Sequence, residues 1–428
     1  MKAGLHIIYA PQKSLFNIQM KRHILSVLLL ILPGFLSAQN LIWDNAGHPF
    51  VREVYGVAFS ADGSKVLSGS ECTETRLRMW DVQTGSMLWE YQLDSNLMCT
   101  AGVKFSSNGN WLAALEEMGY LLMFDLSSGT PSLTYTVNTG TSGAFAVDFS
   151  PAGDKVVTGC TNNKMIIYDV TTGSQLHNVS AHLGYVFCVA WSHDGQFIAT
   201  GGQDNTIKVW DSTGTLLSTL TGHTGDVYDV KFSADDNFLV SGSQDNSIKI
   251  WNRSTAQLVH TITGHTNDVR AVAISPDGNY ILSGATDATT RIWNFNNYSQ
   301  IASFNQTGAG NVYTVAWSPL ENKVVTGTQN NKVLLWDINN LVGIQDVDGV
   351  QNAGIFPNPA SNAITVISDG LPFPSRYDVF SLQGKVVLSG ILNSEGRLDI
   401  SLLDPGSYFI RIYGSNGPSV GRFVKVRD

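Results

Sequence analysis

The stretch SGSQDNSIKIW, residues 241–251, indicates the fold because the chain repeats it. Similar stretches occur at 158–168, 200–210, 283–293 and 326–336. Each ends in an aromatic residue that Asp or Asn follows, and two earlier units end in the same kind of pair. The seven pairs are Trp80-Asp81, Phe124-Asp125, Tyr168-Asp169, Trp210-Asp211, Trp251-Asn252, Trp293-Asn294 and Trp336-Asp337. Successive pairs are 41 to 44 residues apart, so the sequence predicts seven structural repeats.

Each repeat has the pattern of four short antiparallel strands. In the fifth repeat, β-rich runs at 227–233, 238–243, 247–251 and 257–262 alternate with turn residues. One such sheet has two faces to bury and is not stable alone. Seven sheets in a ring cover one another, so we expect an all-β, seven-bladed β-propeller. Segment 40–45 precedes the first repeat and is expected to complete the seventh blade, which closes the ring.

The repeats resemble the WD repeat. Gly222-His223 opens one unit and Trp251-Asn252 closes its third strand, as in that family. The motifs GHTNDV with RIWN and AHLGYV with KVWD are similar. The resemblance covers about residues 40 to 340 and is most specific in units four to six, because units two, three and seven lack the Gly-His pair. It implies a propeller whose rims bind proteins or peptides and carry no chemistry.

Three repeats carry His, Ser or Thr, and Asp at one fixed spacing, a set that could serve as a nucleophilic triad. An enzyme has little use for three copies around a ring, so we interpret them as structural. In one copy, the Trp251 indole can donate to Ser241, Ser241 to His223, and His223 to Asp245. This matches the tetrad of WD repeats. The expected tetrads are His182-Thr200-Asp204-Trp210, His223-Ser241-Asp245-Trp251 and His265-Ser283-Asp287-Trp293.

Composition narrows the classes of function. The 428 residues include 26 Lys and Arg against 35 Asp and Glu, a formal charge of −9. No basic stripe follows the first two dozen residues, so nucleic-acid binding is not expected. The four cysteines show no metal-ligand spacing, and neither a metal nor a cofactor is expected. Small buried apolar residues are the simpler interpretation for at least two of them. Cys72 and Cys99 are expected on one face of adjacent blades and are a candidate disulfide.

The amino-terminal segment has the layout of a secretory signal peptide. From Met20 onward a basic start leads into an apolar run at 24–36, and Ser37-Ala38 offers a small-residue cleavage site. The alternative is a membrane anchor, but the run is about thirteen residues and a span needs roughly twenty. We therefore interpret 1–38 as upstream residues plus signal, with Met20 as the expected true start. No later segment is expected to span a bilayer.

The composition changes after Leu341. We expect the propeller at 39–340, a linker at 341–352 and a small immunoglobulin-like β-sandwich at 353–428. The tail resembles the C-terminal sorting domain of type IX secretion. The residues that carry this resemblance are Phe356, Pro357, Asn358, Pro359, Gly384, Gly406 and Tyr408. It implies a Gram-negative protein that reaches the periplasm by its signal, crosses the outer membrane, and is released or held at the cell surface.

A candidate binding surface lies where the innermost strands begin. Tyr228 has that position in the fifth repeat, and its equivalents are Tyr55, Ala101, Phe145, Phe187, Arg270 and Tyr313. Aromatic residues and arginine dominate binding hot spots, although such a ring could also merely seal the channel. We expect a non-catalytic, monomeric propeller that binds a protein or peptide there. The alternative is a secreted propeller enzyme acting on glycans or peptides, but no catalytic motif supports it.

Overall fold

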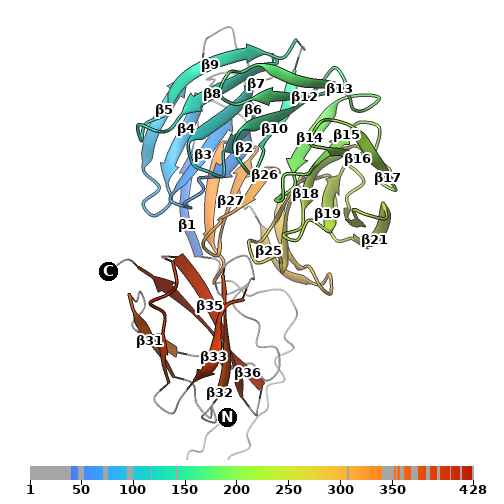
Figure 1. Cartoon of the computed structure of the whole chain (residues 1–428). Helices are drawn as coiled ribbons and strands as arrows, with labels where there is room; N and C mark the ends of the chain where they lie inside the picture. Colours follow the sequence, from blue (N-terminus) through green and yellow to red (C-terminus); the bar gives the residue numbers. More distant parts are fainter. Residues whose placement is uncertain are drawn as a thin grey trace, which may run out of the picture. The chain divides into compact units, whose positions relative to one another are not determined.

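The computed structural model describes residues 40–46, 53–70, 76–93, 100–116, 118–140, 143–305, 308–339, 351–352, 354–356, 361–367, 375–381, 386–392, 396–404, 406–414 and 417–426. The expected signal segment at 1–38 lies outside this part of the chain. The elements with defined bounds are all β-strands. Twenty-eight of them form seven four-stranded antiparallel sheets, and Figure 1 shows these sheets as successive blades, coloured from blue through green to orange along the chain. The prediction of a seven-bladed β-propeller is confirmed.

Each blade runs from an inner strand at the channel to an outer strand at the rim. The inner strands are β2 (Val54–Phe59), β6 (Thr100–Phe105), β10 (Ala144–Phe149), β14 (Val186–Trp191), β18 (Val227–Phe232), β22 (Val269–Ile274) and β26 (Val312–Trp317). The middle strands are β3 (Lys65–Ser70), β4 (Arg76–Asp81), β7 (Trp111–Glu116), β8 (Tyr120–Asp125), β11 (Lys155–Cys160), β12 (Lys164–Asp169), β15 (Phe197–Gly202), β16 (Thr206–Asp211), β19 (Phe238–Ser243), β20 (Ile248–Asn252), β23 (Tyr280–Ala285), β24 (Thr289–Asn294), β27 (Lys323–Thr328) and β28 (Lys332–Asp337). The outer strands are β5 (Met87–Gln92), β9 (Ser132–Asn138), β13 (Gln175–Ser180), β17 (Leu216–Thr221), β21 (Gln257–Ile262), β25 (Gln300–Asn305) and β1 (Asn40–Ala46).

The ring closes through the first described strand. β1 pairs antiparallel with β28, from Asn40 opposite Asp337 to Ala46 opposite Lys332, and so supplies the outer strand of the seventh blade as predicted. The Trp43 indole donates to the Val82 carbonyl oxygen at 3.0 Å, which ties β1 to the first blade as well. Inner strand β26 contacts β2, just as every other inner strand contacts the next. The propeller therefore has no break between its first and last repeats.

Neighbouring blades approach closely at one repeated glycine. A Cβ atom added at Gly242 would lie 2.8 Å from Cγ1 of Val269 in the next blade, closer than two carbon atoms can pack. Gly159, Gly201, Gly284 and Gly327 meet a valine of the following blade in the same way. The second blade is different, because Leu115 has the position of the glycine and Ala144 has that of the valine; both are fully buried in one cluster. At this contact the large residue, Leu115, is on the earlier blade and the small residue, Ala144, is on the following blade, the reverse of the glycine and valine pairs.

The carboxy-terminal segment forms a domain of two sheets (Figure 1). One has the order β29 (Gln351–Asn352), β36 (Gly417–Lys425), β35 (Gly406–Gly414), β32 (Ser375–Ser381) and β33 (Val386–Leu392). The other contains β30 (Gly354–Phe356), β31 (Ala363–Ile367) and β34 (Arg397–Asp399). Buried residues of both sheets, among them Ile364, Val379 and Ile410, make one core. The segment is therefore a β-sandwich, and it shares no sheet with the propeller.

Candidate functional site: the mouth of the channel

The seven inner strands line a channel of about 610 Å³. The lining includes consecutive residues of several inner strands, for example Tyr55 to Phe59. Six of the predicted binding residues line it: Tyr55, Phe145, Phe187, Tyr228, Arg270 and Tyr313. We call these six, with Ala101, the mouth ring. Ala101 begins the second blade within β6, and the structure describes only its backbone.

The large side chains of the mouth ring contact one another in blade order. Ring centroids are 5.5 Å apart between Phe145 and Phe187, 5.2 Å between Phe187 and Tyr228, and 4.9 Å between Tyr55 and Tyr313. All of them are half-buried. The mouth ring is therefore aromatic from Phe145 to Tyr228 and again from Tyr313 to Tyr55, and it is partly open to solvent.

Arg270 fills the place between two tyrosines. Its guanidinium carbon lies 3.9 Å from the ring centre of Tyr228 and 5.7 Å from that of Tyr313. A guanidinium over an aromatic face is held by the quadrupole of the ring. No carboxylate of the described residues lies within ion-pair distance of it, although its charge acts on the Asp226 carboxylate and opposes the rise in the pKa of that group that burial causes.

A second layer lies one residue before each inner strand, at the entrance above the mouth ring. We call its described members the entry residues: Glu53, Gly143, Tyr185, Asp226, Asp268 and Asn311. Glu53 accepts hydrogen bonds from the hydroxyls of Tyr55 and Tyr313, the latter at 3.0 Å. Tyr185 packs 6.0 Å from Phe145 and 5.9 Å from Phe187. The entry residues thus extend the mouth ring toward solvent.

The entry residues are charged on one side only. Burial and the nearby Asp268 carboxylate raise the pKa of Asp226, against the opposing charge of Arg270. Burial likewise raises the pKa of the Tyr228 hydroxyl. Neither Asp226 nor Asp268 takes part in an ion pair with any described residue. The prediction from sequence did not include this layer, although the same alignment of repeats, shifted by two residues, locates it.

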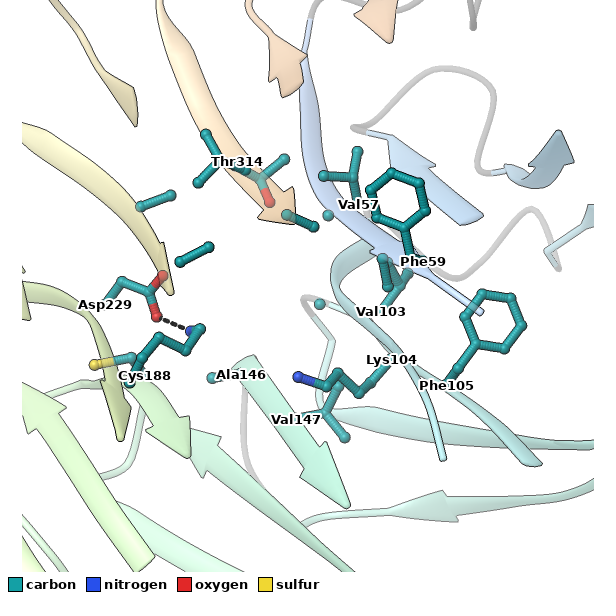
Figure 2. A pocket seen from close by; sticks show the side chains of 18 of the residues that line it. Val57, Phe59, Val103, Lys104, Phe105, Ala146, Val147, Cys188, Asp229 and Thr314 are labelled. Carbon is teal, nitrogen blue, oxygen red and sulfur yellow. Dashed lines mark hydrogen bonds and ion pairs between the residues drawn. The ribbon is translucent and has the colours of Figure 1, made fainter. Parts of the chain in front are cut away.

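Deeper in the channel, charges come from the second, third and fifth blades. Lys104 Nζ lies 3.1 Å from Asp148 Oδ1, and Lys231 pairs with Asp229. Each carboxylate also accepts a backbone N–H from the following blade: Asp148 from Trp191 at 2.8 Å, and Asp229 from Val272 at 3.0 Å. Figure 2 shows Lys104 and Asp229 pointing into the channel from different strands. These pairs neutralise each other and link adjacent blades.

The structure brings together the residues of all three predicted tetrads. In the fifth blade, Trp251 Nε1 donates to Ser241 Oγ at 2.9 Å, and His223 Nε2 and Nδ1 lie 2.7 Å from Ser241 Oγ and from Asp245. The sixth blade repeats the arrangement with distances of 2.7 to 2.9 Å among His265, Ser283, Asp287 and Trp293. The fourth does so with 2.8 to 3.0 Å among His182, Thr200, Asp204 and Trp210. Ser241, Ser283 and Thr200 are fully buried, so a substrate cannot reach these hydroxyls.

The protonation states fit this network. Burial lowers the pKa of His182, His223 and His265, and the neighbouring carboxylates only partly offset it. Although burial opposes the carboxylate charge, hydrogen bonds from Thr206, the Leu183 backbone and His182 lower the pKa of Asp204 to about 2. A neutral histidine then donates from Nδ1 to the carboxylate and accepts the hydroxyl proton at Nε2. Each polar group has a partner, as a buried network requires.

In the other blades the described residues show only parts of the network. In the first, Trp80 Nε1 donates to Ser68 Oγ at 2.8 Å. In the seventh, Thr326 Oγ1 and Trp336 Nε1 are buried with no hydrogen-bond partner among the described residues. Among the cysteines, Cys160 and Cys188 are buried. The candidate disulfide between Cys72 and Cys99 lies outside the described residues and stays a prediction.

Most of the predicted sorting motif also lies outside the described part of the chain: Pro357, Asn358, Pro359 and Gly384. Phe356 ends β30, and Gly406 begins β35. Tyr408 is buried and donates its hydroxyl to the Asp404 carbonyl oxygen at 2.7 Å. The described residues contain no group of three His, Cys, Asp or Glu side chains placed to hold a metal. None of the helices in the described part is long and apolar enough to cross a membrane.

Comparison with curated proteins finds partial relatives. Autophagy-related protein 16 of Arabidopsis thaliana is 28% identical over 181 residues, 40% of this chain and 34% of that protein. Eukaryotic translation initiation factor 3 subunit I of Culex quinquefasciatus is 29% identical over 160 residues, 35% and 48% of the two chains. WD repeat-containing protein 1 of Mus musculus is 24% identical over 196 residues, 42% and 31%. The chain thus matches about a third to a half of the length of these relatives.

Family models match both parts of the chain. The model described as the secretion system C-terminal sorting domain matches residues 354–426. The model described as WD domain, G-beta repeat matches six segments, which leave strands β6, β7 and β8 of the second blade uncovered: 40–81, 129–169, 173–211, 214–252, 256–294 and 299–337. Together these segments span more than half of the sequence. The chain therefore belongs to the WD-repeat family and ends in a C-terminal sorting domain.

Proposed function

We propose that the protein is a non-catalytic interaction platform that binds a protein or peptide at the mouth ring. The observation that carries the proposal is the ring itself: five half-buried aromatic side chains and one arginine, in contact around an open channel. Partly exposed aromatic residues and arginine are the residue types that contribute most to binding energy in interfaces. A ring that only seals a channel would be expected to bury these side chains more fully.

The carboxy-terminal sorting domain indicates where the protein acts. A sorting domain of this class directs proteins out of the cell by way of the periplasm, so we propose that the propeller meets its partner outside the outer membrane or on the cell surface. The machinery that recognises the tail is the second partner.

The absence of catalysis is part of the proposal. The repeated His, Ser or Thr, and Asp sets are fully engaged with tryptophan and with each other, and the hydroxyls are buried. A screen of the purified protein against glycan and peptide substrates tests this. Hydrolysis that survives when Ser241 and Ser283 are both replaced by Ala would support the enzyme alternative at another site.

A double variant tests the binding surface. Tyr228→Ala with Tyr313→Ala should leave the melting temperature close to that of the parent and abolish recovery of the partner from an envelope extract. If the ring only seals the channel, the double variant should instead lose about 3 kcal/mol or more of stability, as for large buried aromatics.

Leu258→Ala is the matched control. Leu258 is an exposed apolar residue on the outer strand of the same blade as Tyr228, and its loss should leave partner recovery unchanged. A stable double variant that still recovers the partner would place binding elsewhere.

A further inference from the structure

The mouth of the channel has two chemically different halves. On the side of the third and fourth blades the entry residues are Gly143 and Tyr185, above Phe145 and Phe187. Leu183, two residues before Tyr185, is 92% exposed, the highest exposure of any large apolar residue described. The fifth and sixth repeats have Thr224 and Thr266 at that position. This half is an apolar surface that continues from the channel to the outside.

The opposite half, from the fifth blade round to the first, is acidic. Its entry residues are Asp226, Asp268, Asn311 and Glu53. This half thus has three carboxylates against one guanidinium, that of Arg270. None of the three has an ion-pair partner among the described residues, and Asp226 and Asp268 belong to adjacent blades. The net charge of this half is negative and uncompensated, which attracts a positively charged group.

The aromatic faces already hold such a group. Arg270 lies against Tyr228 and Tyr313, and its charge acts on the Asp226 carboxylate, so a guanidinium is held on this surface by ring faces and by carboxylate charge. A second cation entering above it would have the ring edges below and the carboxylates of the entry residues beside it. Carboxylates form the stronger, charge-assisted hydrogen bonds with arginine and lysine.

The two halves adjoin. Phe187 of the apolar half lies 5.2 Å from Tyr228 of the acidic half. Side chains two residues apart on one face of an extended segment are separated by roughly 7 Å. A short extended segment can therefore place one side chain on each half.

We propose that the mouth binds an extended protein segment with a basic side chain next to, or two residues from, a large apolar side chain. The basic group contacts Asp226 and Asp268, and the apolar group packs on Tyr185 and Leu183. This deepens the proposed function and rests on it. It specifies the chemistry of the partner, which the mouth ring alone does not specify.

A peptide array tests this directly. The probes are acetylated, amidated hexapeptides in a Gly-Ser frame, in which two positions, adjacent or two apart, vary over all amino acids. The full chain should select peptides with Arg or Lys beside Leu, Ile, Phe, Tyr or Trp. Replacing Asp226 and Asp268 together by Asn should reduce affinity for the basic peptides about tenfold, the scale of a lost charge-assisted hydrogen bond.

Two further variants separate the halves. Tyr185→Ala should weaken all selected peptides, basic or not, whereas the double Asn variant should keep its preference for apolar residues. Asp404→Asn removes an exposed carboxylate from the tail and is the charge control, with no expected effect. Circular dichroism melting curves establish that each variant is folded.

Selection of acidic residues would overturn the proposal, because Arg270 would then be the group that recognises the ligand. An unchanged basic preference in the double Asn variant, no charge preference, or no selection at all would overturn it too. The proposed function fails separately, when the Tyr228→Ala with Tyr313→Ala variant still recovers the envelope partner. The two failures are therefore distinguishable.

Discussion

Two threonines occupy the same repeat position in opposite surroundings. Thr200 bonds to His182 and Trp210, whereas Thr326 is buried and its hydroxyl has no hydrogen-bond partner among the residues that the structure describes. Replacement of threonine by valine keeps the shape and removes the hydroxyl. Thr200→Val should lower the free energy of unfolding by about 1–3 kcal/mol, because two buried nitrogen groups lose their partner.

The same change in the seventh blade is the control. Thr326→Val should alter stability by no more than about 0.5 kcal/mol, or raise it, because the lost hydroxyl bonds to nothing. Denaturant unfolding measures both values. Equal losses would mean that the tetrad adds nothing beyond the packing of its side chains.

The tetrad histidines make stability depend on pH. In the folded protein the pKa of each of these histidines is lower than the ordinary value of 6.5. Below pH 6.5 they therefore bind more protons in the unfolded chain than in the folded chain. The stabilisation is complete above that value and is lost as the pH falls below it. Asp204, with a pKa of about 2 against an ordinary 3.8, adds a second loss in more acidic solution.

The melting temperature should therefore fall from about pH 7 to pH 5, where histidine titrates. His265→Ala should lower stability at neutral pH by about 1–3 kcal/mol, since Ser283 and Asp287 lose a partner. It should also flatten the pH dependence, because one of the titrating groups is gone. If the melting temperature of the variant depends on pH as steeply as that of the parent, groups other than His265 cause the pH dependence.

At the scale of the blade, the contact between neighbours offers a sharper test. Leu115 and Ala144 exchange the sizes that glycine and valine have at the same contact elsewhere. Ala144→Val alone should overpack the contact and cost about 1–3 kcal/mol. Leu115→Gly alone should leave a cavity. The double variant restores the arrangement of the other blades and should recover about 1 kcal/mol or more relative to the sum of the single changes.

Strictly additive effects would show that the two side chains do not share one contact. The double-mutant cycle by denaturant unfolding decides this, with Gly242→Ala as a reference for a clash at the unmodified contact. That variant should be destabilised, because its Cβ would press on Val269.

Most elements of the propeller could be predicted from sequence, because the repeat fixes the turns and the alternation in every blade at once. The segment with Trp43 was assigned to the last blade because counting left one strand without a sheet. The asymmetry of the mouth was harder to see. It depends on single residues, such as Tyr185 and Asp268, at loop positions where the repeats do not share a residue type. These positions are far apart in the sequence, and only the closed ring of blades brings them together. The sorting motif lies mostly outside the described residues.

For the whole molecule, the two parts of the chain should separate in function. The propeller has its own closed ring of sheets, and the tail has its own core. Removing residues 353–428 should leave a propeller that folds and stays in the periplasm. Cell fractionation with a protease-protection assay measures this. Truncated protein in the medium or on the cell surface would show that the tail does not direct export.

The central claim is that the partner docks at the mouth of the channel. The most direct measurement is light-induced cross-linking in cells from a benzoylphenylalanine placed at Tyr185 or at Leu217. Both positions belong to the fourth blade and are exposed, one beside the mouth ring and the other on the outer strand β17. We predict a discrete cross-linked product from position 185 and none from position 217. A product from position 217 alone would contradict the account and place the partner on the outer edge of the blades.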